Sequence, residues 1–186
     1  MRRLLLAALS LAIVLMAATA AGGQTKARGT FQTLRAGTDL GLHIEGSATI
    51  NVSDEGTVVT AEVRGLKPGK IYAAHLHGAS CSGDNPGGGH YKNDANGPSK
   101  PPNELWLSST DDPTAGIKAD EHGVAHGRGS ADWVPRPDTS LSVVIHNIPE
   151  GGDTSGGPKI ACADLPVERR SDHPGDSGDW QNQGND

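Results

Sequence analysis

The feature that most restricts the fold is an alternation between apolar and polar positions that recurs from about residue 38 to residue 165. Short stretches with a period of two are separated by Gly, Pro, Asn and Asp, and no long segment has the 3.6-residue period of a helix. This pattern predicts an all-β fold, a Greek-key β-barrel or sandwich of about eight antiparallel strands with long loops. The expected strands are Leu40–Val52, Thr57–Leu66, Ile71–His77, Glu104–Ser108, Ile117–Ala119, Val124–Gly129, Leu141–Ile148 and Lys159–Ala163.

Three segments lack the strand pattern. Residues 78–103 are rich in Gly and Pro, and a loop this long within a compact domain is usually functional or disordered. Residues 167–186 are mostly small, polar or acidic, and we expect a disordered tail there. Residues 22–37 are expected to form a flexible or weakly paired lead-in. The predicted organisation is therefore a single β-domain over 38–166.

Residues 1–21 have the composition of a secretory signal peptide. Arg2 and Arg3 precede an apolar run, and Ala18-Thr19-Ala20 is a small-x-small cleavage site. A membrane anchor is the alternative, but the run of about 15 residues is shorter than the roughly 20 needed to cross hydrocarbon. We therefore expect a secreted or periplasmic protein with no membrane span.

Two further properties limit the chemistry and the partners. The mature part contains only Cys81 and Cys162, and an even pair in an exported chain predicts one disulfide, with two free thiols as the alternative. The net charge of −6 at pH 7 argues against a nucleic acid or an anionic membrane as a partner.

Four histidines are candidates for a metal site. His75 and His77 lie on a strand-like run, where the period of two sends both imidazoles to one face and Leu76 into the core. His90 follows three glycines that let the backbone fold back closely, and His146 ends an apolar strand. Imidazoles without thiolates favour copper or a zinc-like divalent ion. Surface or internally hydrogen-bonded histidines are the alternative on spacing alone.

These histidines belong to a longer series of short blocks. In chain order the blocks are GLKPGK at 65–70, HLH at 75–77 with Cys81 four residues on, GGH at 88–90, ADEHGVA at 119–125, VVIH at 143–146 and GPKIAC at 157–162. Over roughly residues 40–165 this order resembles the copper/zinc superoxide dismutase family. The resemblance implies a copper site made of His75, His77, His90 and His146. It also implies that a Cys81–Cys162 disulfide ties the long loop to the last strand.

The chain departs from the family pattern at the zinc site. The family uses the bridging histidine, here His90, with two more histidines and an aspartate in the following loop, but no histidine lies between His90 and His122. The remaining oxygen or amide candidates alone make a poor zinc site, so zinc is not expected; they are Asp94, Asn103, Glu104, Asp111 and Asp112. His90 then needs a carboxylate, carbonyl or water partner for its second ring nitrogen.

A second departure is Lys159, which stands where the family has an arginine that guides superoxide. Lysine keeps the charge but lacks the planar fork of donors. The resemblance implies a secreted copper-dependent enzyme that converts superoxide to O₂ and H₂O₂, with Lys159 attracting the anion and His90 helping to deliver a proton. The alternative is a non-enzymatic domain of the same fold that binds, stores or delivers copper.

Overall fold

The alternating pattern produces strands with one buried face. The computed structural model describes residues 24–167. In β3 (Glu45–Ser53) the buried side chains include Ala48, Ile50 and Val52, and the antiparallel neighbour β4 (Gly56–Arg64) buries Val59 and Val63. Because side chains alternate between the two faces of a strand, these apolar groups all point into the core.

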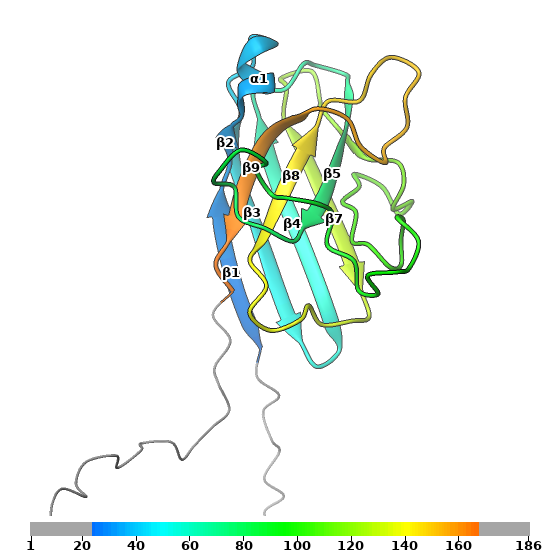
Figure 1. Ribbon diagram of the computed structural model, residues 1–186. Helices are drawn as coiled ribbons and strands as arrows, with labels where there is room; N and C mark the ends of the chain where they lie inside the picture. Colours follow the sequence, from blue (N-terminus) through cyan, green and yellow to red (C-terminus); the bar gives the residue numbers. More distant parts are fainter. Residues whose placement is uncertain (1–23, 168–186) are drawn as a thin grey trace, which may run out of the picture.

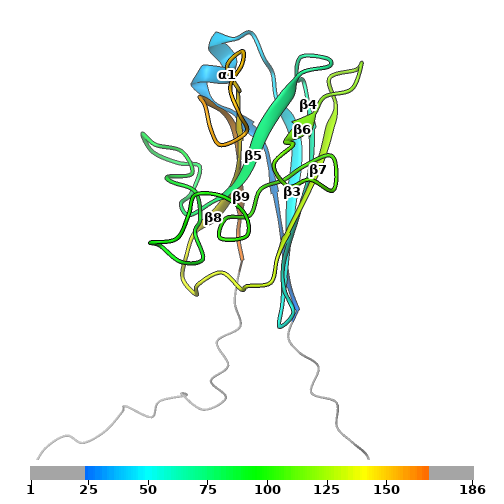
Figure 2. The same ribbon diagram turned by 90° about the vertical axis from the view of Figure 1, so that its right-hand side faces the viewer.

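The strands form two antiparallel sheets that lie face to face (Figures 1 and 2). The first has the order β1-β3-β4-β7, with β1 at Thr25–Thr30 and β7 at Ala125–Ala131. The second has the order β2-β9-β8-β5-β6, with β2 at Gln32–Thr33, β9 at Lys159–Leu165, β8 at Leu141–His146, β5 at Ile71–His77 and β6 at Ile117–Lys118. The chain passes from one sheet to the other more than once. β7 returns to the first sheet and pairs with β4, and β8 returns to the second and pairs with β5. The predicted all-β fold is confirmed. Of the two forms expected, a barrel or a sandwich, the described residues form the sandwich, because the two sheets do not close into a barrel.

The described part of the expected flexible or weakly paired lead-in over 22–37 forms regular elements. Residues 25–39 form β1, β2 and a short helix, α1 (Arg35–Asp39). β1 pairs with β3 at the edge of the first sheet. Backbone pairing can hold such an edge strand without an apolar pattern, and the sequence TKARGT has none. Gly29 lies so close to β9 that a Cβ there would be 1.7 Å from the carbonyl oxygen of Asp164. The expected strand from Leu40 begins only at Glu45.

The strand expected at Glu104–Ser108 is also different. This segment forms isolated bridges to His75, Lys92 and Arg128. The amide of Leu76 donates to the carbonyl of Leu105, and further along the same edge of β5 the amide of Tyr91 donates to Leu76. These short segments therefore share the edge of β5 with β6, and the expected strand at Glu104–Ser108 is reduced to isolated bridges.

The outer face of the second sheet carries the candidate site. In β5 the side chains of Tyr72, Ala74 and Leu76 belong to the core, as predicted for Leu76, so His75 and His77 face away from it. The loops that follow β5 and β8 lie over this outer face (Figure 2).

Covalent and polar contacts hold the long loop in place. Cys81 and Cys162 form a disulfide across 81 residues of sequence, which confirms the predicted pair. The amide of Cys81 donates to Asp164 Oδ1 at 2.7 Å. Further along the loop, the Tyr91 hydroxyl accepts from the Arg136 amide at 2.6 Å and the Tyr91 ring packs on Trp133. A disulfide between these positions suggests an oxidising compartment.

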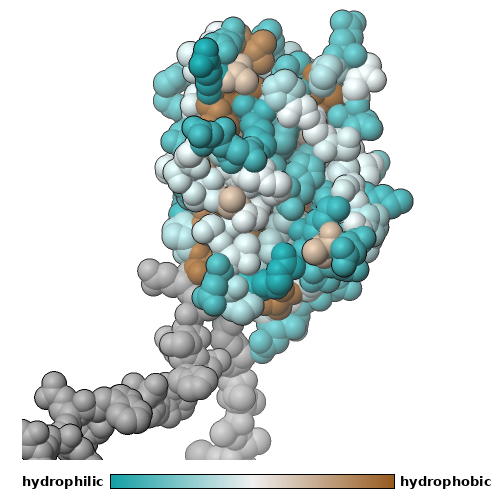
Figure 3. All heavy atoms as spheres, in the orientation of Figure 1, coloured by the Kyte–Doolittle hydropathy of each residue, from teal (hydrophilic) through white to brown (hydrophobic). Residues whose placement is uncertain are grey.

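The face seen in Figure 3 is mostly hydrophilic, with apolar groups scattered over it. Across the described residues, the large apolar side chains that are exposed are Leu40, Ile71 and Val134. No helix in this part of the chain has both the length and the apolar character needed to span a membrane. The predicted signal peptide over 1–21 and the predicted tail beyond Val167 lie outside the described residues.

Candidate metal centre

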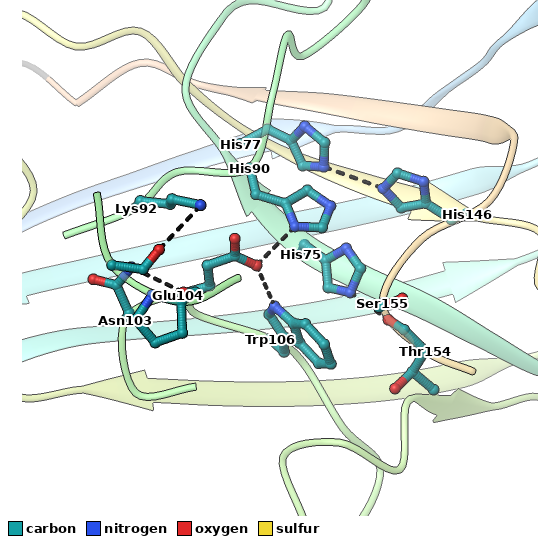
Figure 4. A network of polar contacts seen from close by, with 12 residues as sticks. His75, His77, His90, Lys92, Asn103, Glu104, Trp106, His146, Thr154 and Ser155 are labelled. Carbon is teal, nitrogen blue, oxygen red and sulfur yellow. Dashed lines mark hydrogen bonds and ion pairs between the residues drawn. The ribbon is translucent and has the colours of Figure 1, made fainter. Parts of the chain in front are cut away.

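Four imidazoles converge on the outer face of the second sheet (Figure 4). His75 and His77 come from β5, His146 from the end of β8, and His90 from the long loop. Each ring offers one nitrogen, and the four nitrogens lie within 4.8 Å of one another. Nitrogens bound to one ion at about 2.0 Å lie up to about 4 Å apart, so small side-chain movements would close the set around a metal.

Sheet register and glycines account for this convergence. β8 lies beside β5 with Val144 opposite His75, and His146 follows two residues later on the same face. The loop comes back over this face at Gly87, which has a φ of 75° and no room for a side chain: a Cβ would be 2.5 Å from Val144 Cγ2. The backbone then forms an isolated bridge between His90 and His77.

Backbone carbonyls fix the orientation of three rings. His77 Nδ1 donates to the carbonyl of Gly88 at 3.2 Å, and His146 Nδ1 donates to Gly157 at 2.8 Å. His75 Nε2 donates to the carbonyl of Thr154 at 2.7 Å. Because a carbonyl can only accept, the proton of each neutral ring lies on that nitrogen and the lone pair lies on the other.

One contact and one unpartnered nitrogen inside the cluster favour a bound cation. His77 Nε2 lies 3.1 Å from His146 Nε2, and the carbonyl bonds leave lone pairs on both atoms. His75 Nδ1 is buried and has no hydrogen-bond partner. A buried acceptor without a partner is costly, and a metal ion between these nitrogens would satisfy all three.

A carboxylate orients the fourth ring. His90 Nδ1 donates to Glu104 Oε2 at 2.7 Å, and the indole N–H of Trp106 donates to the same oxygen at 2.8 Å. The Glu104 side chain is only 1% exposed, and its Oε1 makes no hydrogen bond. A buried carboxylate is costly unless a positive charge lies nearby, which an ion on His90 would supply.

Burial keeps three of the four histidines neutral. It lowers the pKa of His75 and of His77 to about 2, and electrostatic repulsion from the neighbouring imidazoles lowers it further. Burial likewise lowers the pKa of His146 to about 4. These imidazoles are therefore unprotonated near pH 7, which is the form that binds a metal ion.

Four of the five oxygen and amide candidates for a zinc site, Asp94, Asn103, Glu104 and Asp112, have other partners. Asp94 and Asn103 bond to the backbone of their own loop, and Asp112 Oδ1 accepts from the amide and hydroxyl of Thr114. Glu104 is the member that reaches the histidines. Within residues 24–167 the four-histidine cluster is the one group of three or more His, Cys, Asp or Glu side chains arranged to hold an ion.

Lys159 contacts the loop beside the cluster. Its Nζ donates to Asn85 Oδ1 at 2.7 Å and to the carbonyls of Pro86 and Gly88 at 2.9 and 2.5 Å. Burial lowers its pKa from the ordinary value of lysine. The expected superoxide-guiding residue is thus bonded to three oxygens of the protein.

The fold and the site define the class: a β-sandwich protein with a buried four-histidine group that can hold a metal ion. Comparison of the sequence with protein-family models and with curated proteins finds no match. The chemistry of the site therefore has to be argued from its own residues.

The free energy of unfolding of the metal-free protein should fall as pH drops below 6.5. Between about pH 6.5 and 4 the unfolded chain takes up protons that folded His75, His77 and His146 exclude, so stability rises with pH in this window. The slope should reach at most about 1.4 kcal/mol per pH unit for each histidine. Urea denaturation at a series of pH values measures it, and a stability that stays level down to about pH 5 would contradict neutral burial.

Replacing Glu104 by Gln should weaken Cu²⁺ binding by about 10- to 100-fold, because the amide is a weaker acceptor for His90 Nδ1 and does not neutralise the ion. Chelator competition measures the affinity. Glu121→Gln makes the same change on a side chain that is 87% exposed and should have no effect. Equal affinities in the two variants would refute the role given to Glu104.

Proposed function

We propose that this chain is a secreted copper-dependent superoxide dismutase that converts superoxide to O₂ and H₂O₂. The observation that most supports the proposal is the set of four imidazole nitrogens around one buried space, three of them fixed by carbonyls on the opposite ring nitrogen. The order of sequence blocks resembling the copper/zinc superoxide dismutases supports it independently. The disulfide agrees with an exported protein.

The donor set favours copper over other ions. All four donors are imidazoles, and among divalent first-row metals Cu²⁺ binds nitrogen sites most strongly. Both cysteines are in the disulfide, so no thiolate competes as a ligand. A second ion such as zinc would need His90 Nδ1, the atom that donates to Glu104. We therefore propose one copper and no zinc.

Bound copper would alternate between Cu²⁺ and Cu⁺, oxidising one superoxide to O₂ and reducing the next, with two protons, to H₂O₂. The protein's part is to hold the ligands and admit the substrate. The residues His75, His77 and His146 are 0–3% exposed, whereas the His90 side chain is 19% exposed. Solvent, protons and a small anion can therefore reach the cluster from the side of His90.

His90 is also placed to hold a proton. Its Nδ1–H is shared with Glu104 Oε2, which leaves Nε2 facing the other three rings. Nε2 would be the atom that His90 offers to the copper, and as a base on the solvent side it could also pass a proton to the reduced substrate. Glu104 would hold the ring in place for both roles.

Storage or delivery of copper is the second candidate function. The engagement of the Lys159 ammonium by three protein oxygens favours it, because superoxide would find no free donor on that residue. The two functions share the metal site and differ in whether the bound copper turns over superoxide.

Metal analysis of the purified protein followed by a dismutation assay tests the proposal. After exposure to both metals, the protein should hold about one copper and almost no zinc per chain. It should also consume superoxide catalytically. His146→Ala should lower the rate by about 100-fold or more, because it removes one ligand and exposes the ion to water.

His43→Ala is the matched control. His43 is 86% exposed at its side chain and bonds only to Glu45, so its loss should leave both copper content and rate unchanged. A copper-loaded protein without dismutase activity would favour storage or delivery. Stoichiometric zinc in place of copper would contradict both functions.

A further inference from the structure

Lys159 lies at the start of β9, where the sheet register places it opposite His146. Its side chain runs toward the long loop and ends among the oxygens of residues 85–88. An ammonium has three N–H bonds, and here they face three acceptors. No N–H of Lys159 is left to dock an anion.

One of these acceptors also orients a histidine. The carbonyl of Gly88 accepts from Lys159 Nζ at 2.5 Å and from His77 Nδ1 at 3.2 Å. The position of this carbonyl decides which ring nitrogen of His77 keeps its proton and where the Nε2 lone pair points. Lys159 therefore contacts the group that sets the geometry of His77.

The same stretch of loop leads directly to His90. The amide of Gly87 donates to Ser80 and that of Gly88 to Asn85, which forms a tight turn, and Gly89 accepts from Gly78. These bonds fold the turn onto itself and onto the end of β5. The lysine adds the link from this turn to β9.

We propose that Lys159 is a positioning residue, which clamps the turn at 85–88 so that Gly88 holds His77 and the turn presents His90 to the metal. The inference rests on the proposed copper centre. It replaces the expectation that Lys159 docks superoxide, which the resemblance implied. A tetrahedral ammonium suits three acceptors converging on one atom, whereas the planar guanidinium of arginine spreads its donors over a fork.

Two variants separate the clamp from an attracting charge. Lys159→Met removes both the clamp and the charge, whereas Asn85→Ala removes one clamp bond and keeps the charge. The control is Lys26→Met, which removes the same charge from an exposed position on β1 in the other sheet. The readouts are Cu²⁺ affinity by chelator competition, the Cu²⁺ electron paramagnetic resonance spectrum, and amide hydrogen exchange of residues 85–90 in the metal-free protein.

If Lys159 is a clamp, both site variants should speed exchange at 85–90, change the copper hyperfine splitting and weaken Cu²⁺ binding by about 10-fold. Lys159→Arg should fail to restore the wild-type spectrum, and Lys26→Met should match the wild type. Wild-type behaviour of Asn85→Ala, together with rescue by arginine, would overturn the clamp. If wild-type protein binds no copper, the proposed function fails, and hydrogen exchange still decides whether Lys159 holds the turn.

Discussion

Three backbone carbonyls and one carboxylate hold four imidazoles with their lone pairs toward one buried space, and the rest of the site depends on this arrangement. Without an ion, unshared electron pairs face each other at 3.1 Å between His77 and His146. The surrounding loops must resist this repulsion. The acceptors come from both sides of the cluster, Gly88 from the loop after β5 and Gly157 from the loop after β8. The sheet therefore carries three of the histidines, and the loops fixed on it supply His90 and the acceptors that orient the rings.

Charge balance explains why Glu104 lies where it does. Near pH 7 burial keeps His75, His77 and His146 neutral, so these three rings have no positive charge to match a carboxylate that is 1% exposed. A divalent ion would supply that charge through His90. Because the carboxylate takes the Nδ1 position, the same contact leaves that nitrogen unavailable to a second metal. The hydrogen bond between His90 and Glu104 thus favours a centre with a single ion and orients His90, the most exposed of the four ligands.

Sequence patterns predicted the parts of this structure that depend on side-chain periodicity. Most strands of the sandwich, the disulfide and the four converging histidines follow from alternation, from cysteine number in an exported chain and from the H-x-H pair with its companion blocks. β1 was not predicted because a polar edge strand is held by backbone bonds. The contacts of Gly88, Thr154 and Gly157 leave no side-chain signal, since any residue has a carbonyl. Glu104 was considered only as a zinc ligand, although the need of His90 for a partner pointed to a residue of this kind.

X-ray absorption at the copper edge of the Cu²⁺-loaded protein tests the central claim most directly, because it counts the imidazoles bound to the ion. The four-histidine arrangement predicts a shell of about four imidazole nitrogens near 2.0 Å, with the multiple scattering typical of histidine rings and no sulfur. A shell dominated by oxygen, with two imidazoles or fewer, would contradict the convergence of His75, His77, His90 and His146 on one metal.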